Sequence, residues 1–255
     1  LVRYLSREQY GSTPLLYGQY YGAPWDLKQS KYWAPLDGKY KYVDGPVQAK
    51  YNADAKMLFP RMWSDGGGDS KRFEEFYNFY TKGKGRKVRN AHAPKPTMGA
   101  NLAYFFDYQL NWMYWRYFMW NFVGRQNDIH SPTPGDIFYG NWESGIKFID
   151  DFRLGNQENA PALLKDNKAK NHYFFLPLLL GILGLCFQFI RDKRGSWLTF
   201  LMFFMTGIAI VIYLNQPPFQ VRERDYAYAG SFYFFSIWCG LGLAAIYQWI
   251  EDARK

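Results

Sequence analysis

Four consecutive charged residues, Arg222, Glu223, Arg224 and Asp225, lie in the segment QPPFQVRERDYAYAG between two strongly apolar stretches. Arginine can grip phosphate oxygens with a planar fork of donors. Paired arginines at the end of an apolar segment could therefore bind the anionic headgroup of a lipid. The alternative is structural: the arginines could pair with Glu223, Asp225 or neighbouring carboxylates and so fix the loop. Spacing alone favours this structural interpretation.

A second polar cluster, Arg125, Gln126, Asn127 and Asp128, follows a dense aromatic block. The block, residues 101–128, predicts a helix, with Thr97 as a possible N-cap and Gly124 where a C-terminal glycine belongs. We expect this cluster and the RERD segment to face the same side and to bind an anionic headgroup together.

Three uncharged apolar stretches must position these clusters: residues 173–190, 197–214 and 230–250. At about 1.5 Å per residue each is about 27–31 Å long as a helix, close to the roughly 30 Å of a bilayer core. They predict three transmembrane helices. Buried helices of a large soluble core are the disfavoured alternative, because such helices usually carry a polar stripe.

Short connections indicate the orientation. The link at 191–196, RDKRGS, is rich in basic residues and is expected on the cytoplasmic side. By parity, residues 1–171 and the 215–229 loop then face the opposite side.

The predicted fold class is a mainly α integral membrane protein. Residues 1–99 form an extracytoplasmic loop domain, residues 100–171 an aromatic interfacial helix and a polar loop, and residues 172–255 the three spans with the RERDY loop. An interfacial helix suits the aromatic block, because aromatic rings favour the boundary between lipid and water. A fourth span is the alternative, and it would carry Asp107 and Arg116 into the bilayer.

Within the first region, KRFEEFYNFYTK (71–82) predicts a short amphipathic helix, and YVDGP (42–46) and SDGGGDS (64–70) are turn signals. The second signal contains Asp65 and Asp69, which lack the alternating ligand pattern of a calcium loop.

Composition excludes several classes of function. The net charge of +9 is spread along the chain, apart from a basic run at 81–95 that is typical of a solvated loop, so nucleic acid is not an expected partner. The histidines and cysteines have no metal-ligand spacing, and we predict neither a metal nor a cofactor. The apolar stretches carry no ionisable residue, which disfavours a transporter.

Three stretches are similar to a known family: YLSREQYGSTPLLYGQYY (4–21), MYWRYFMWNFVGRQND (113–128) and FFMTGIAIVIYLNQPPFQVRERDYAYAGSFY (203–233). The chain resembles an internal segment of the bacterial protein O-mannosyltransferase-like integral membrane family, a branch of the GT-C glycosyltransferases. The resemblance implies transfer of a sugar from a polyprenyl-phosphate donor to Ser or Thr of exported proteins, at the periplasmic face of the inner membrane. In the resembled family the sugar is mannose.

In the resembled family the acidic catalytic residue lies in an earlier loop, so the catalytic base stays unassigned. If the donor is a lipid phosphate, charge and placement make Arg222, Arg224 and Arg125 the candidates for its phosphate, Arg222 and Arg224 first. The supporting polar residues are Glu223, Asp225, Gln126, Asn127 and Asp128, and the pocket aromatics are Tyr226 and Tyr228. The expected partners are the lipid-linked donor, the exported acceptor protein and membrane lipid. A non-catalytic scaffold or glycan-binding module that stacks sugars on aromatic side chains is the alternative function.

Overall fold

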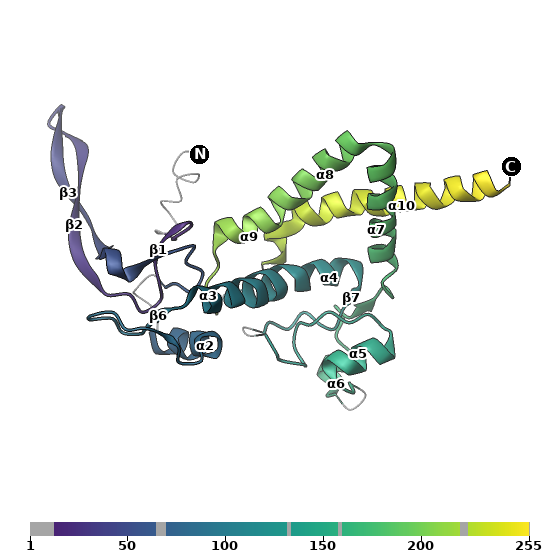
Figure 1. Cartoon of the computed structure of the whole chain (residues 1–255), viewed down its shortest axis with the longest axis horizontal. Coiled ribbons are helices and arrows are strands. Elements are labelled where there is room, and N and C mark those ends of the chain that lie inside the picture. The colour runs from purple at the N-terminus through teal and green to yellow at the C-terminus, as the bar shows by residue number, and fades with distance from the viewer. Residues whose placement is uncertain (1–12, 65–69, 132–133, 158–159, 220–223, 255) are drawn as a thin grey trace. The chain divides into compact units, whose positions relative to one another are not determined.

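The computed structural model describes residues 13–64, 70–131, 134–157, 160–219 and 224–254. The chain divides into two compact units, Leu1–Phe105 and Phe106–Lys255, which are described in turn (Figure 1).

The N-terminal unit contains antiparallel two-stranded sheets and two helices. Its sheets pair β1 (Tyr17–Gln19) with β4 (Lys56–Leu58), β2 (Trp25–Leu36) with β3 (Lys39–Tyr51), and β5 (Gly85–Arg86) with β6 (Lys95–Pro96). Its helices are α2 (Ser70–Thr81), α3 (Met98–Tyr104) and the short 3-10 turn η1 (Ala53–Ala55). Strands β2 and β3 form a long ribbon (Figure 1).

The ribbon turns at Asp37 and Gly38, which both have positive φ. Asp-Gly is a favoured pair for a two-residue hairpin turn, because both positions need left-handed backbone. The expected turn at 42–46 is wrong, since these residues lie inside β3. On the partner strand β2 the pairing register shifts between Gln29 and Lys31. Gly45 and Pro46 of YVDGP lie opposite this shift, so the turn-type residues occur at a β-bulge or similar irregularity.

Helix α2 confirms the amphipathic helix expected at 71–82. Its Tyr77 is fully buried and donates a hydrogen bond to the carbonyl of Trp63 at 3.0 Å. The Tyr77 ring also contacts Tyr21 and Tyr104, with centroids 4.6 and 5.2 Å apart. This aromatic group forms a core beneath the small sheets.

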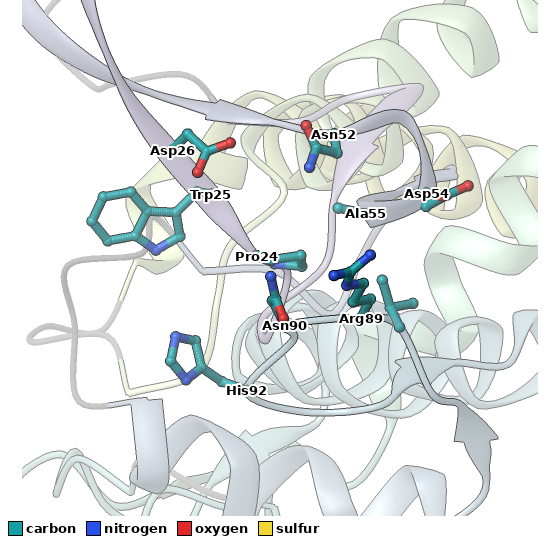
Figure 2. Close-up of a pocket in the computed structure, with 10 residues that line it drawn as sticks. Pro24, Trp25, Asp26, Asn52, Asp54, Ala55, Arg89, Asn90 and His92 are labelled. Atoms are coloured by element: carbon teal, nitrogen blue, oxygen red, sulfur yellow. The ribbon is translucent and has the colours of Figure 1, made fainter.

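A polar cavity of about 600 Å³ opens in the N-terminal unit beside the start of β2. Figure 2 shows the residues that line it. The sequence motifs did not point to it.

The aromatic block forms a helical run whose ends match the expectation. Thr97 caps α3, and its hydroxyl accepts from the Ala100 amide at 3.2 Å. The π-helix η2 (Phe105–Trp115) and α4 (Arg116–Phe122) follow, and the chain leaves helical geometry just before Gly124, whose φ is +139°.

The C-terminal unit is mainly helical. After α4 come the strand pair β7 (Gly124–Arg125) and β8 (Asn171–His172), and the helices α5 (Lys147–Leu154), α6 (Ala162–Lys165), α7 (Leu176–Arg191), α8 (Lys193–Thr206), α9 (Ile208–Leu214), η3 (Asp225–Tyr228) and α10 (Ala229–Ala253).

Two glycines let α7 and α10 approach closely. A side chain at Gly184 would collide with the backbone of Trp238, and one at Gly242 would collide with the backbone of Leu180. Beside this contact Phe235 packs its ring against Phe118 and Phe122, at 4.7 and 4.5 Å. The aromatic helix is thereby joined to the apolar helices.

The predicted fold class is wrong in two respects. Among the described residues two helical runs, Lys193–Leu214 and Asp225–Ala253, are long and apolar enough to cross a membrane, whereas α7 is too short for that test. The first region also folds into paired strands and is not a loop domain. The chain is therefore not a clear three-span helical membrane protein.

The interfacial placement of the aromatic helix is part of that correction. In the C-terminal unit most of its aromatic residues are buried against protein, whereas Phe106 and Trp115 are exposed; the buried ones include Trp112, Tyr114, Tyr117, Phe118, Trp120 and Phe122. Aromatic side chains suit a protein core as well as a lipid boundary, so composition could not separate the two.

Candidate functional site

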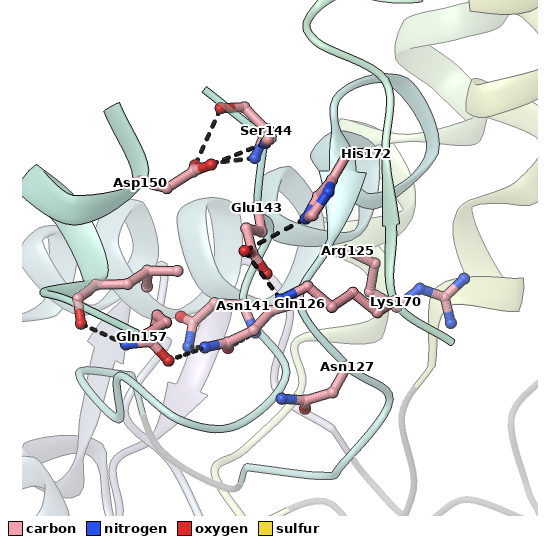
Figure 3. Close-up of polar contacts among 12 residues, drawn as sticks. Arg125, Gln126, Asn127, Asn141, Glu143, Ser144, Asp150, Gln157, Lys170 and His172 are labelled. Carbon is pink, nitrogen blue, oxygen red and sulfur yellow. Dashed lines mark hydrogen bonds and ion pairs between the residues drawn. The ribbon is translucent and has the colours of Figure 1, made fainter. Parts of the chain in front are cut away.

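The candidate site is a polar cluster at the end of α4, defined by Arg125, Gln126, Asn127, Asn141, Glu143, Lys170 and His172 (Figure 3). The chain reaches it through Gly124, where a Cβ atom would collide with the backbone of Glu143 and Asn171. Strand β7 then pairs with β8, which brings Arg125 opposite Asn171. Residues separated by almost fifty positions in sequence therefore lie side by side.

Buried amides fix the loop after β7. Asn127 is fully buried; its Nδ2 donates to the Phe138 carbonyl at 2.7 Å, and its Oδ1 accepts from the amides of Gly140 and Ile129 at 2.8 and 3.2 Å. Gln126 donates to the Ile137 carbonyl at 2.9 Å and accepts from the Asn141 side chain at 3.1 Å. These amides order the backbone and have little capacity left for a ligand.

A carboxylate lies beside two basic side chains next to the β7–β8 pair. Oε1 of Glu143 is 3.1 Å from Nζ of Lys170 and 3.3 Å from Nε2 of His172, and the Glu143 side chain is only 9% exposed. Its other oxygen, Oε2, is buried and accepts no hydrogen bond from the described residues. Lys170 neutralises the carboxylate, which leaves Arg125 as the cation of this cluster without a carboxylate partner among the described residues.

The neighbouring helix α5 is anchored in a similar way. Asp150 accepts from the amides of Ser144 and Gly145 at 2.9 and 2.8 Å. Arg153 lies over the Trp142 ring at 3.3 Å and donates to the Trp142 carbonyl at 3.0 Å. Burial lowers the pKa of Arg153 to about 10, against the opposing effect of the Asp150 charge.

The loop that carries the RERD segment is anchored at both ends on the aromatic helix. At its start, Nε2 of Gln109 donates to Oδ1 of Asn215 at 3.0 Å and to the Gln216 carbonyl at 2.9 Å. At its end, the hydroxyls of Tyr114 and Ser231 are 2.7 Å apart. Burial raises the pKa of Tyr114 to about 12, so this phenol stays protonated at neutral pH.

Arg224 and Arg125 share neighbours on α4. The Arg224 amide donates to the Tyr117 hydroxyl at 3.2 Å, and the Tyr117 ring lies 5.1 Å from that of Trp120. The Arg125 guanidinium lies 4.7 Å from the Trp120 centroid, and Arg116 lies near the same ring at 4.8 Å. The Arg125 guanidinium and the Arg224 backbone, from distant parts of the sequence, thus lie at the neighbouring rings of Trp120 and Tyr117.

The remaining expected site residues are placed as follows. Arg222 and Glu223 lie outside the described residues. Asp225 begins η3, and no carboxylate of a described residue pairs with Arg224. Tyr226 is 70% exposed, whereas Tyr228 is 1% exposed and packs on Tyr114, with centroids 5.3 Å apart.

Asp128 lies apart from the arginines. It accepts from the Asn167 side chain at 3.1 Å beside a shallow cavity that Asp166 and Lys168 also line. Among the described residues no group of three or more His, Cys, Asp or Glu could hold a metal ion.

Sequence reasoning missed Gln109, Tyr117 and Glu143. Gln109 and Tyr117 lie in the aromatic helix that was expected to face lipid, and a polar group on such a helix is a signal for an internal partner. Glu143 has no comparable signal, because its partners are far away in sequence.

One family model matches part of the chain. It is described as a family of unknown function (DUF8416), and it matches residues 11–106, nearly the extent of the N-terminal unit. No curated protein and no solved structure matches the chain.

Proposed function

We propose that the chain is part of a glycosyltransferase that moves a sugar, mannose in the family it resembles, from a polyprenyl-phosphate donor to Ser or Thr hydroxyls of exported proteins. The observation that carries the proposal is that the Arg125 guanidinium lies over Trp120 while the Arg224 backbone bonds the neighbouring Tyr117 hydroxyl on α4, so that both residues lie at one aromatic pair. A donor of this kind has an anionic phosphate and an apolar tail, so its site must join cations to an apolar surface.

The reaction explains why arginines are needed. The acceptor oxygen forms a bond to the sugar C1 atom, the bond from C1 to the phosphate oxygen breaks, and the hydroxyl proton passes to a base. Negative charge develops on the departing polyprenyl phosphate, and positioned Arg donors stabilise it. Arg224 and Arg125 are assigned to this charge, while no base is assigned.

The apolar helices supply a surface for the lipid tail. Large apolar side chains point outward on α8 and α10, among them Trp197, Leu198, Leu243 and Tyr247. Exposed apolar patches of this kind mark a protein or lipid contact. The proposal places the chain at the bacterial inner membrane, with the 215–229 loop toward the periplasm.

The connectivity is compatible with that orientation. Lys193 begins α8, and Arg224 follows the loop after α9, so a 22-residue helical run separates the basic α7–α8 turn from the start of the arginine loop. At about 1.5 Å per residue the run is roughly 33 Å long.

The test is sugar transfer by the full-length protein in membranes, from polyprenyl-phosphate mannose to a Ser/Thr peptide. Arg224→Ala and Arg125→Ala are each expected to lower the rate at least ~10-fold, since losing one positioned donor typically costs on the order of 100-fold or more. Arg224→Lys should retain part of the rate, because lysine keeps the charge and loses the fork.

Arg194→Ala is the matched control, because Arg194 is an exposed arginine near the start of α8. It should leave transfer unchanged. Normal transfer by Arg224→Ala at normal protein levels would overturn the donor-phosphate assignment. Binding of the donor without any transfer by the unaltered protein would favour the scaffold alternative, which the polar cavity of the N-terminal unit also supports.

A further inference from the structure

The N-terminal unit holds a cavity that lies outside the arginine site. It is lined chiefly by Trp25, Asp26, Asn52, Arg89, Asn90 and His92, with a volume of about 600 Å³. Figure 2 shows Trp25 and His92 on one side and Asn52 and Arg89 on the other. The volume is within the usual range for small-ligand sites, about 300–1,000 Å³.

Three chain segments meet around the cavity, and backbone contacts hold them in place. The His92 amide donates to the Gly22 carbonyl at 3.0 Å, which ties the 88–92 loop to the residues before β2. A Cβ atom at Gly22 would meet Ala93, so only glycine permits this approach. Nζ of Lys95 donates to the carbonyls of Lys56 and Asp54, at 2.5 and 3.3 Å, which ties the η1 turn to β6.

The polar lining has free hydrogen-bonding capacity. No described residue forms a hydrogen bond or ion pair with the side chains of Asp26, Asn52, Arg89, Asn90 or His92. An amide both donates and accepts, a carboxylate accepts, and a guanidinium donates. The backbone of the walls is held in place, and these exposed side chains are free to bond a ligand without first breaking a bond within the described residues.

The chemistry of the lining selects the class of ligand. Asp26 and Asp54 outweigh the single cation Arg89, which disfavours phosphates and other anions. The lining is mostly polar, which disfavours a purely apolar molecule. Trp25 adds a flat indole that is 39% exposed and can pack against an apolar face.

We infer that this cavity binds a neutral carbohydrate, with one sugar ring against the Trp25 indole and its hydroxyls bonded to Asp26, Asn52 and Asn90. A sugar ring offers an apolar C–H face and a rim of hydroxyls that both donate and accept, which is the complement of this lining. The inference requires only the N-terminal unit and is independent of glycosyl transfer at Arg224.

The experiment is calorimetric titration of the full chain with mannotriose, cellotriose and chitotriose. We expect at least one to bind, and Trp25→Ala and Asn90→Ala each to weaken its binding at least 10-fold. Trp33→Ala is the matched control: Trp33 is on the same strand, is 62% exposed and lies outside the cavity. It should bind as the unaltered chain does.

Absence of binding by all three sugars would overturn the inference. Equal losses of sugar affinity in Trp25→Ala and Trp33→Ala would also overturn it. The sugar would then be binding along the exposed ribbon and not in the cavity. Competition by inorganic phosphate at the same residues would contradict the neutral class. Because the readout is binding, any of these results leaves the transfer assay of the arginine variants unaffected.

Discussion

A fully buried asparagine that bonds three backbone groups is found in both compact units, and the two units use it differently. In the N-terminal unit, Asn101 on α3 accepts from the amides of Arg61 and Met62, at 2.8 and 3.2 Å, and donates to the Phe59 carbonyl at 2.6 Å. In the C-terminal unit, Asn127 bonds the Ile129 amide in its own loop and the Phe138 carbonyl and Gly140 amide in the 138–140 segment.

The difference lies in what else holds each unit. Around Asn101 the sheets are short and the long ribbon is largely exposed, so the buried amide is a main link between α3 and the chain beneath it. In the C-terminal unit the helices α7 and α10 are held by apolar packing and by close glycine contacts, which do not involve Asn127. The same side chain therefore supports a fold in one unit and orders a candidate site in the other.

The largest expected effect comes from breaking the helix contact of the C-terminal unit. Gly184→Val would force a side chain into the backbone of Trp238, and we expect a loss of about 3 kcal/mol. Gly240→Ala on α10 is the control, because a Cβ there meets nothing within 4 Å. It should be neutral or stabilising by up to ~1 kcal/mol through helix propensity. Denaturant unfolding followed by helical circular dichroism measures both; an unchanged midpoint for Gly184→Val would refute the close approach.

The asparagines give the next effect and address the comparison directly. Asn101→Ala and Asn127→Ala each leave buried backbone groups without partners, at a cost of about 2–3 kcal/mol. Hydrogen exchange should show faster exchange at residues 59–62 in Asn101→Ala and at residues 138–140 in Asn127→Ala.

Asn52→Ala is the control for both asparagine variants, because the Asn52 side chain is exposed. It should change stability by no more than about 0.5 kcal/mol. Equal loosening of both units by either variant would contradict their independence.

The smallest effect at neutral pH concerns two buried phenols of the N-terminal unit. The hydroxyls of Tyr20 and Tyr21 are buried and have no partner among the described residues, so Tyr20→Phe should be neutral or slightly stabilising. A clear loss of stability in this variant would show that the hydroxyl has a partner.

Because of the same phenols, we expect the free energy of unfolding to depend on pH in the alkaline range. Burial raises the pKa of Tyr20 and of Tyr21 to about 12, from about 10 in the unfolded chain. Between these values the unfolded chain releases protons that the folded chain keeps, so stability is full below pH 10 and falls as the pH rises toward 12. The free energy of unfolding measured from pH 8 to 12 should lose part of this dependence in the double Phe variant, whereas Tyr40→Phe, on the exposed ribbon, should not alter it.

Local signals located several elements correctly. The pattern at 71–82 predicts α2 within one residue at each end, and Thr97 and Gly124 bracket the aromatic helix. The ribbon was missed because its alternating runs, Trp25–Lys28 and Lys39–Tyr42, are short, and because most of its side chains are exposed on both faces, so no continuous apolar face reveals a strand.

The sequence by itself determined the ends of α2 and of the aromatic helix and which segments are long and apolar, because these depend on residues within one or two turns of each other. Only the tertiary structure decided that most rings of the aromatic helix are buried in protein, that Arg125 and the Arg224 backbone lie at Trp120 and Tyr117, and that Glu143 lies beside Lys170 and His172. Those outcomes depend on packing between residues far apart in the chain, and an aromatic or charged side chain carries no local mark of its distant partner.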